Sequence, residues 1–158
     1  MPKKATPKKT AVKKATTSKP ETPEVKTQKM SPVNHFEITF DNLDRVKKFY
    51  SSIFGWNYVD FPEMDYTVVR TTEVDKNQMP ITAGAVNGGF TKKSLARNYP
   101  TLVITVQSVD EASAKIKPLG GELIGERLDI GNMGIYQMFK DSEGNILGLF
   151  ENKAPTLD

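Results

Sequence analysis

A strand-helix pattern occurs twice in this chain, and the two copies align without a gap, with Gly55 of the first on Gly121 of the second. In the first copy, residues 33–40 alternate apolar and polar side chains, which is the period of a strand with two different faces. Residues 43–53 then carry apolar side chains at helical spacing, and Gly55 stands where a helix would end in a left-handed turn. A matching strand and helix begin at Thr101 and end before Gly121. The repeat predicts two copies of one supersecondary unit that pack together.

Each copy continues with runs that are typical of three more strands. In the first copy these strands are expected at residues 56–61, 66–70 and 80–86, with a turn at residues 87–89. In the second copy they are expected at residues 122–128, 135–140 and 146–151. Asp41 or Asn42 is expected to cap the first helix, and Ser108 with Glu111 forms a capping box for the second. The order in each copy is therefore strand, helix, strand, strand, strand.

Length and composition limit the classes of protein that remain. A chain of 158 residues is enough for one domain with its own core. It contains no cysteine, which excludes disulfides and thiolate chemistry. No apolar run approaches the length of a membrane span, and no apolar region of a secretory signal follows the first lysines. We therefore expect a cytoplasmic protein without a membrane partner.

The N-terminal segment, residues 1–31, differs in charge from the rest of the chain. It carries nine lysines against two glutamates, a net of +7, so the formal charge of +3 leaves −4 for the remainder. The segment has too few large apolar residues to bury surface, and it is predicted to be a disordered tail. Two interpretations stay open, a solubilising extension without a partner and weak contact with nucleic acid or another polyanion. In the second, the contacts would be made by paired lysines, namely Lys3, Lys4, Lys8, Lys9, Lys13 and Lys14.

The ordered part resembles the vicinal oxygen chelate superfamily, which includes glyoxalase I, bleomycin resistance proteins and extradiol dioxygenases. The resemblance lies in the two βαβββ copies and in short motifs at residues 49–50, 54–56, 110–112, 120–121 and 141–145. It implies an α+β domain at residues 32–152, with modules at about 33–90 and 100–151 and a loose C-terminus at 153–158. The modules would form a cup of curved mixed sheet with the helices on its outer faces. The helices are expected to bury Val46, Phe49, Tyr50, Ile53, Ala112, Ile116 and Leu119.

Members of this superfamily usually hold a divalent metal with ligands from the first and last strands of each module. His35 stands at the first of these positions, while Thr101 stands at its equivalent in the second copy. Gly148 occupies the place of the family's glutamate, and residues 81–86 contain no histidine, aspartate or glutamate. Because a tight catalytic site needs three or more protein ligands, no metal cofactor is expected, and a divalent metal remains the alternative.

The candidate site lies inside the predicted cup. His35, the only histidine, and Glu37 are the candidate acid-base residues, since both should face the concave side of the first strand. A polar pair in a wet cleft is the alternative. Aromatic residues at strand ends, among them Tyr66 and Tyr136, are candidates to line an apolar pocket. The predicted ligand pocket comprises Thr39, Trp56, Thr101, Val103, Thr105 and Gly148.

Three classes of function follow from these features. The leading hypothesis is a protein that binds a small organic molecule in its cup, either as a binder or as a metal-independent enzyme. The second is a metal-dependent lyase, like lactoylglutathione lyase, or a dioxygenase, with a divalent metal. The third is an interaction protein that uses its basic tail on nucleic acid. The sequence leaves open whether two chains form a homodimer.

Overall fold

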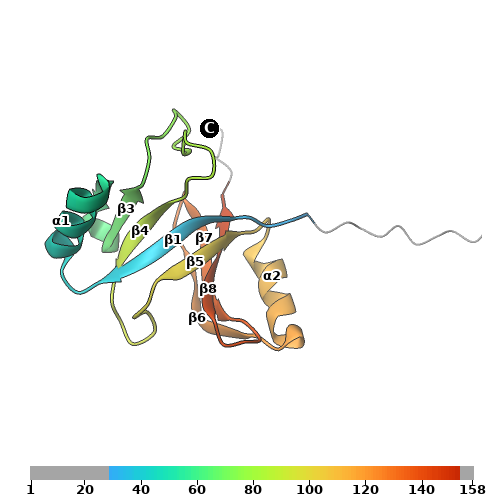
Figure 1. Ribbon diagram of the computed structural model, residues 1–158. Helices are drawn as coiled ribbons and strands as arrows, with labels where there is room; N and C mark the ends of the chain where they lie inside the picture. The colour runs from blue at the N-terminus through green and yellow to red at the C-terminus, as the bar shows by residue number, and fades with distance from the viewer. Residues whose placement is uncertain (1–28, 154–158) are drawn as a thin grey trace, which may run out of the picture.

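The computed structural model describes residues 29–153, which form a single curved mixed sheet of eight strands with a helix near either end (Figure 1). The predicted α+β fold of two βαβββ modules is confirmed. Module 1 consists of β1 (Val33–Phe40), α1 (Leu43–Phe54), β2 (Asn57–Phe61), the short 3-10 helix η1 (Pro62–Met64), β3 (Tyr66–Arg70) and β4 (Asn87–Lys92). Module 2 consists of β5 (Thr101–Thr105), α2 (Val109–Ile116), the short 3-10 helix η2 (Lys117–Leu119), β6 (Glu122–Asp129), β7 (Gly134–Lys140) and β8 (Ile146–Asn152).

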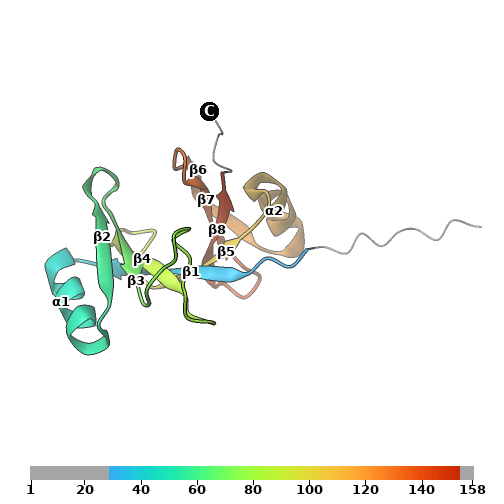
Figure 2. The same ribbon diagram turned by 90° about the horizontal axis from the view of Figure 1, so that it is seen from above.

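The pairing of β1 with β5 in the middle of the sheet preserves the sequence repeat. The strand order is β2-β3-β4-β1-β5-β8-β7-β6, so the two halves mirror each other. In the antiparallel β1–β5 ladder Phe36 faces Leu102, which is its own counterpart in the repeat. The ladder is thus symmetric under the repeat, and the two modules are related by an approximate two-fold axis at this point. Figure 2 shows the modules on either side of it, with the helices at opposite ends.

Both helices begin at the caps that the sequence predicts. The side chain of Asn42 accepts a hydrogen bond from the amide of Arg45, and that of Ser108 accepts one from the amide of Glu111. These bonds satisfy amide groups that have no partner inside a helix. Gly55 ends α1 in the left-handed conformation. This conformation costs glycine little energy, because glycine has no Cβ.

The prediction for the last strand of module 1 was wrong. Residues 80–86 lie in the connection after β3, and the strand is formed by Asn87–Lys92, where a turn was expected. This strand requires glycine at positions 88 and 89, because aromatic rings lie against the backbone there. A Cβ at Gly88 would collide with the Phe36 ring, and one at Gly89 with the Tyr66 ring. Glycine in a strand interior often marks such a close approach.

The helices bury less than the sequence predicts. Tyr50 of α1 does pack inward, with its ring stacked on Trp56 at 4.7 Å and tilted against Phe90 at 5.6 Å. However, α1 has no buried residue, and Phe49 and Ile53 are more than half exposed. The expected burial also fails for Leu119, which is exposed, while Val46, Ala112 and Ile116 are half-buried.

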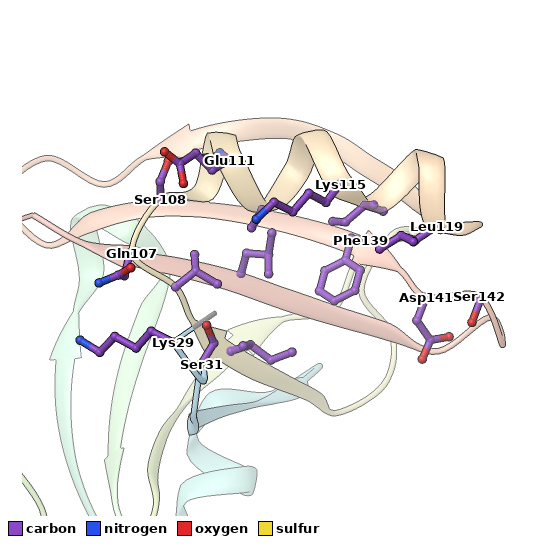
Figure 3. A pocket seen from close by; sticks show the side chains of 16 residues that line it. Lys29, Ser31, Gln107, Ser108, Glu111, Lys115, Leu119, Phe139, Asp141 and Ser142 are labelled. Carbon is purple, nitrogen blue, oxygen red and sulfur yellow. Dashed lines mark hydrogen bonds between the residues drawn. The ribbon is translucent and has the colours of Figure 1, made fainter. Parts of the chain in front are cut away.

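Module 2 has a core on each face of its sheet. Val103, Tyr136 and Met138 form the inner core, on the concave side. Val109, Ile135 and Leu149 form the outer core, under α2. Beside this outer core lies a groove of about 590 Å³, and Figure 3 shows Phe139 and Lys115 among the side chains that line it. None of the residues that line this groove belongs to the predicted site.

Candidate functional site

His35 and Glu37 lie on the inner face of β1, at the middle of the sheet. They are two residues apart on one strand, so their side chains point to the same side. Glu37 is 6% exposed and faces Thr101 of β5, and His35 faces Val103. The structure therefore brings four residues of the predicted site together, two from each module.

Two tyrosines from equivalent strands contact this pair. The hydroxyl of Tyr66 in β3 lies 2.7 Å from Nε2 of His35, and the hydroxyl of Tyr136 in β7 donates to Oε2 of Glu37 at 2.9 Å. Each tyrosine belongs to the third strand of its module. The two tyrosines are therefore equivalent under the two-fold axis, but their contacts are not, because Tyr66 contacts a residue of its own module and Tyr136 contacts one of the other module.

Each tyrosine lies over a glycine in the last strand of its own module. Tyr66 faces Thr91 across the β3–β4 ladder and covers Gly89, two residues away; Tyr136 faces Phe150 and covers Gly148, again two residues away. A Cβ at Gly148 would come within 2.7 Å of the Tyr136 ring, and one at Gly89 would overlap the Tyr66 ring. Because Gly89 and Gly148 have no side chain, the tyrosine ring of each module can lie directly against the last strand.

Arg97 closes the cluster from the connection between the modules. Its guanidinium lies over the ring of Tyr136, with Cζ 4.9 Å from the centroid. Its Nη1 is 3.6 Å from Oε2 of Glu37, and its Nε donates to the sulfur of Met138 at 3.0 Å. The buried carboxylate thus has a cation and a phenol on one of its oxygens, an arrangement that reduces the cost of burying its charge.

Burial keeps His35, Tyr66 and Tyr136 uncharged at neutral pH. Removal from water lowers the pKa of His35 to about 4, so its imidazole is uncharged at neutral pH. Burial, reinforced by the charge of Glu37, raises the pKa of Tyr66 and of Tyr136 above the ordinary value for a phenol. Both phenols therefore keep their protons at neutral pH and can act as hydrogen-bond donors.

A cavity of about 220 Å³ opens beside Glu37 at one end of the cluster. Its floor is formed by Glu37 and Tyr136, which are buried, and its mouth by Asn34 and Asn152, which are exposed. The remaining lining residues are His35, Thr105, Ile130 and Phe150. The cavity can therefore hold a small molecule against a carboxylate at its inner end.

The other predicted pocket residues lie at different distances from this cavity. Val103 packs beneath Tyr136 in the inner core, and Gly148 lies under the same ring. Thr39 is on the face of His35 and Glu37 but further along β1, and it does not line the cavity. The structure does not bring Trp56 to the cavity, because its ring packs against Tyr50 under α1. The lysines of the predicted polyanion contact lie outside the described residues.

The residues present do not fit the metal that the fold family implies. Gly148, which stands in the place of the family's glutamate, and Gly89, its counterpart in β4, are both covered by tyrosine rings, so no longer side chain could be placed at either glycine without moving a ring. Nε2 of His35 is already engaged by Tyr66. Within residues 29–153, no three residues of the types His, Cys, Asp and Glu are grouped so that they could hold an ion. Metal ligation at this site would require a rearrangement of both tyrosines.

Sequence reasoning missed the role of Arg97 and the specific contacts of the two tyrosines. Arg97 lies in a polar connection, and nothing local distinguishes it from a solvated surface residue. Tyr136 did leave a signal, since Gly148 is a glycine inside a predicted strand. Tyr66 left none, because Gly89 lies in a segment that the sequence indicates to be a turn.

Comparisons with known proteins agree with this architecture. A profile of the Glyoxalase/Bleomycin resistance protein/Dioxygenase superfamily matches residues 33–149. "Putative glyoxylase CFP32" of Mycobacterium bovis is 27% identical over 134 residues, which are 82% of this chain and 49% of that protein. The chain thus spans about half the length of the curated relatives that it matches.

Solved structures with the same fold include two from other bacteria. A hypothetical protein of Bacillus halodurans has a TM-score of 0.56 at 15% identity, over 82% of this chain and 100% of that one. Methylmalonyl-CoA epimerase of Streptomyces coelicolor, in complex with 2-nitronate-propionyl-CoA, has a TM-score of 0.54 at 17% identity, over 80% of this chain and 100% of that one. At these identities the likeness shows the fold alone. In residues 29–153, no helix is both long and apolar enough to cross a membrane.

Proposed function

Because the chain belongs to the Glyoxalase/Bleomycin resistance protein/Dioxygenase superfamily, we propose that it binds a small organic molecule in the 220 Å³ cavity beside Glu37, without a metal ion. The observation that carries the proposal is the pair of tyrosines over Gly89 and Gly148. The Tyr136 ring takes the space at Gly148, where the family has its glutamate, and the Tyr66 ring takes the equivalent space at Gly89. The cavity beside Glu37 offers hydrogen-bonding groups instead. Whether the protein only binds this molecule or also converts it depends on Glu37, the one carboxylate that lines the cavity.

The lining suits a ligand that is held by hydrogen bonds and apolar contact. Asn34, Asn152 and Thr105 supply amide and hydroxyl groups, and Ile130 and Phe150 supply apolar surface. A mostly apolar lining with a few convergent polar groups is typical of small-molecule sites. The cavity is smaller than the 300–1,000 Å³ or so of sites for drug-sized ligands, so the molecule, or the part of it that enters, is small.

The proposal is tested by a thermal-shift screen of small metabolites on the full chain, with and without EDTA. A ligand present at 100 times its dissociation constant stabilises the folded state by about 2.7 kcal/mol. We expect hits whose shifts persist in EDTA. Thr105→Phe, which extends a ring into the cavity, should abolish them, and Gln107→Phe, a matched change at the outer groove, should leave them intact.

Other outcomes of the screen would contradict the proposal. Shifts that vanish in EDTA, together with about one metal ion per chain by elemental analysis, would favour the metal-dependent lyase or dioxygenase. Hits that are lost in Gln107→Phe but not in Thr105→Phe would move the binding site to the outer groove. A location in the cytoplasm and a partner for the basic tail remain predictions from the sequence.

A further inference from the structure

The two carboxylate oxygens of Glu37 differ in their partners. Oε2 accepts the hydrogen bond of Tyr136 and is the oxygen nearest to Arg97. Oε1 accepts no hydrogen bond from any residue in 29–153. The only side-chain nitrogen or oxygen in that range that is both sealed from solvent and without a partner is Oγ of Ser113. Oε1 is therefore not sealed, and the cavity that Glu37 lines is the space from which a ligand would reach it.

An accessible oxygen on a nearly buried carboxylate favours a ligand that donates a hydrogen bond. A charge removed from water is costly unless it is paired, and hydrogen bonds to a carboxylate are about twice as strong as those between neutral groups. Glu37 supplies the only carboxylate in the lining, which contains no lysine and no arginine. An anionic ligand would thus meet a carboxylate and no cation.

The surroundings of Oε1 also suit a positive charge. His35 is uncharged at neutral pH because burial lowers its pKa to about 4, so it does not repel a cation. Arg97 lies over the Tyr136 ring on the side of Oε2 and does not line the cavity. Phe150, in the lining, offers an aromatic surface that can attract a cation or pack against an apolar group.

Size sets the remaining limit. A water molecule occupies about 30 Å³ in the liquid, so a cavity of 220 Å³ has the volume of about seven waters. A ligand with a single ring or a short chain fits these dimensions.

We propose that the cavity binds the protonated amino group of a small organic amine, with Oε1 of Glu37 as its acceptor and with Phe150 and Ile130 against its apolar part. The inference rests on the proposed function, because it names the ligand class of the same cavity. It goes beyond that function by requiring a charge: the neutral alcohol of the same shape should bind less tightly, and the carboxylate least tightly.

The test compares benzylamine, benzyl alcohol and benzoate, three probes of similar shape, on the full chain at pH 7 by calorimetry or NMR titration. We expect benzylamine to bind at least tenfold more tightly than benzyl alcohol, and benzoate to bind least tightly. Glu37→Gln should reduce the affinity for benzylamine to that for benzyl alcohol, with little change for the alcohol. Glu111→Gln, which removes a carboxylate from the outer groove, is the matched control and should change nothing.

A second variant does not depend on a change at a buried position. Asn152 is exposed at the mouth of the cavity, so Asn152→Lys should fold normally while it adds a positive charge there. It should weaken benzylamine several-fold and strengthen benzoate. Equal affinities for the three probes, or tightest binding of benzoate, would overturn the amine inference and leave the proposed function standing. Absence of binding for all three, together with a metabolite screen without hits, would overturn both.

Discussion

The two modules share one chain path but differ in what their side chains do. Within residues 29–153, six of the eight buried hydrophobic side chains belong to module 2, and only Val69 and Phe90 belong to module 1. His35 and Glu37, the candidate acid-base residues, both belong to module 1. At the equivalent positions of module 2 in the repeat stand Thr101 and Val103, which are buried.

This difference shows that the two copies of a repeat can share one backbone fold while their side chains have different roles. Tyrosine over glycine is preserved in both modules, as is the central ladder, because these features depend on the geometry of the sheet. The side chains that face the middle of the cup are not preserved. Module 2 supplies most of the buried apolar surface, and the polar groups of module 1 lie against it, with Glu37 held by Tyr136 across the two-fold axis.

The largest loss of stability is expected when alanine replaces the glycine under a tyrosine ring, and the two tyrosine-glycine pairs can be compared in this way. Gly148→Ala should lower the free energy of unfolding by about 3 kcal/mol, the upper end of typical overpacking costs, because the Tyr136 ring is 4% exposed and cannot move aside. Gly89→Ala should cost roughly half of that, about 1.5 kcal/mol, since Tyr66 is only half-buried and can swing outward. Denaturant unfolding measures both values.

The control for these variants is Gly148→Ala combined with Tyr136→Leu. The smaller side chain relieves the collision, so the double variant should cost less than the sum of the two single changes. A larger loss for Gly89→Ala than for Gly148→Ala would contradict the expectation that the Tyr136 ring moves aside less readily than the Tyr66 ring.

Acid should destabilise the protein through a group that only module 1 has. His35 has a pKa of about 4 in the folded chain and an ordinary value near 6.5 when unfolded. Between these values the unfolded state binds a proton that the folded state excludes, so the free energy of unfolding falls as the pH decreases through this window. From pH 7 to pH 4.5 the loss from this residue should be about 2 kcal/mol.

Carboxylates also titrate as the pH falls, so the contribution of His35 must be measured as the difference between the parent chain and a variant that lacks this histidine. His35→Gln keeps a hydrogen-bonding group for Tyr66 but does not titrate. Its unfolding free energy, measured by urea titration at both pH values, should fall by less than that of the parent chain. An identical pH dependence of the two proteins would mean that His35 is not desolvated.

Removal of a tyrosine hydroxyl should cost more unfolding free energy at the contact with the carboxylate of Glu37 than at the contact with the neutral His35. Tyr136→Phe deprives a buried carboxylate of a hydrogen bond and should cost about 1.5 kcal/mol of unfolding free energy. Tyr66→Phe breaks a bond to the neutral His35 and should cost about 1 kcal/mol or less. Tyr99→Phe, at an exposed position, is the control and should have no effect. Equal losses for Tyr66→Phe and Tyr136→Phe would contradict the expectation that the bond to the Glu37 carboxylate is the stronger of the two.

The smallest effect is expected on the outer side of α1. Phe49→Gln replaces a side chain that is 54% exposed and should change the free energy of unfolding by less than about 0.5 kcal/mol. Ile116→Gln, at a half-buried position of α2 that packs on the outer core, should cost more. A large loss for Phe49→Gln that depends on protein concentration would show that α1 is covered in solution, as in the homodimer that the sequence leaves open.

The local pattern of the sequence was sufficient for most of the elements, although not for the last strand of module 1. Alternation in residues 33–40, the caps at Asn42 and Ser108 and the internal repeat predicted seven of the eight strands and both helices. These features depend on the periods of strand and helix, which neighbouring residues in the chain determine. His35 and Glu37 could be placed on one face of β1 for the same reason.

Only the tertiary structure decided what those side chains meet. Residues 80–86 look like a strand and Gly88-Gly89 like a turn until the rings of Phe36 and Tyr66 are placed over the two glycines. Tyr136 is separated from Glu37 by 99 positions in the sequence, and Arg97 reaches Glu37 from a connection without a regular pattern. A periodic sequence fixes the face on which a residue lies, but its partner across the sheet depends on how distant strands come together. The unpaired oxygen of Glu37 follows from that assembly.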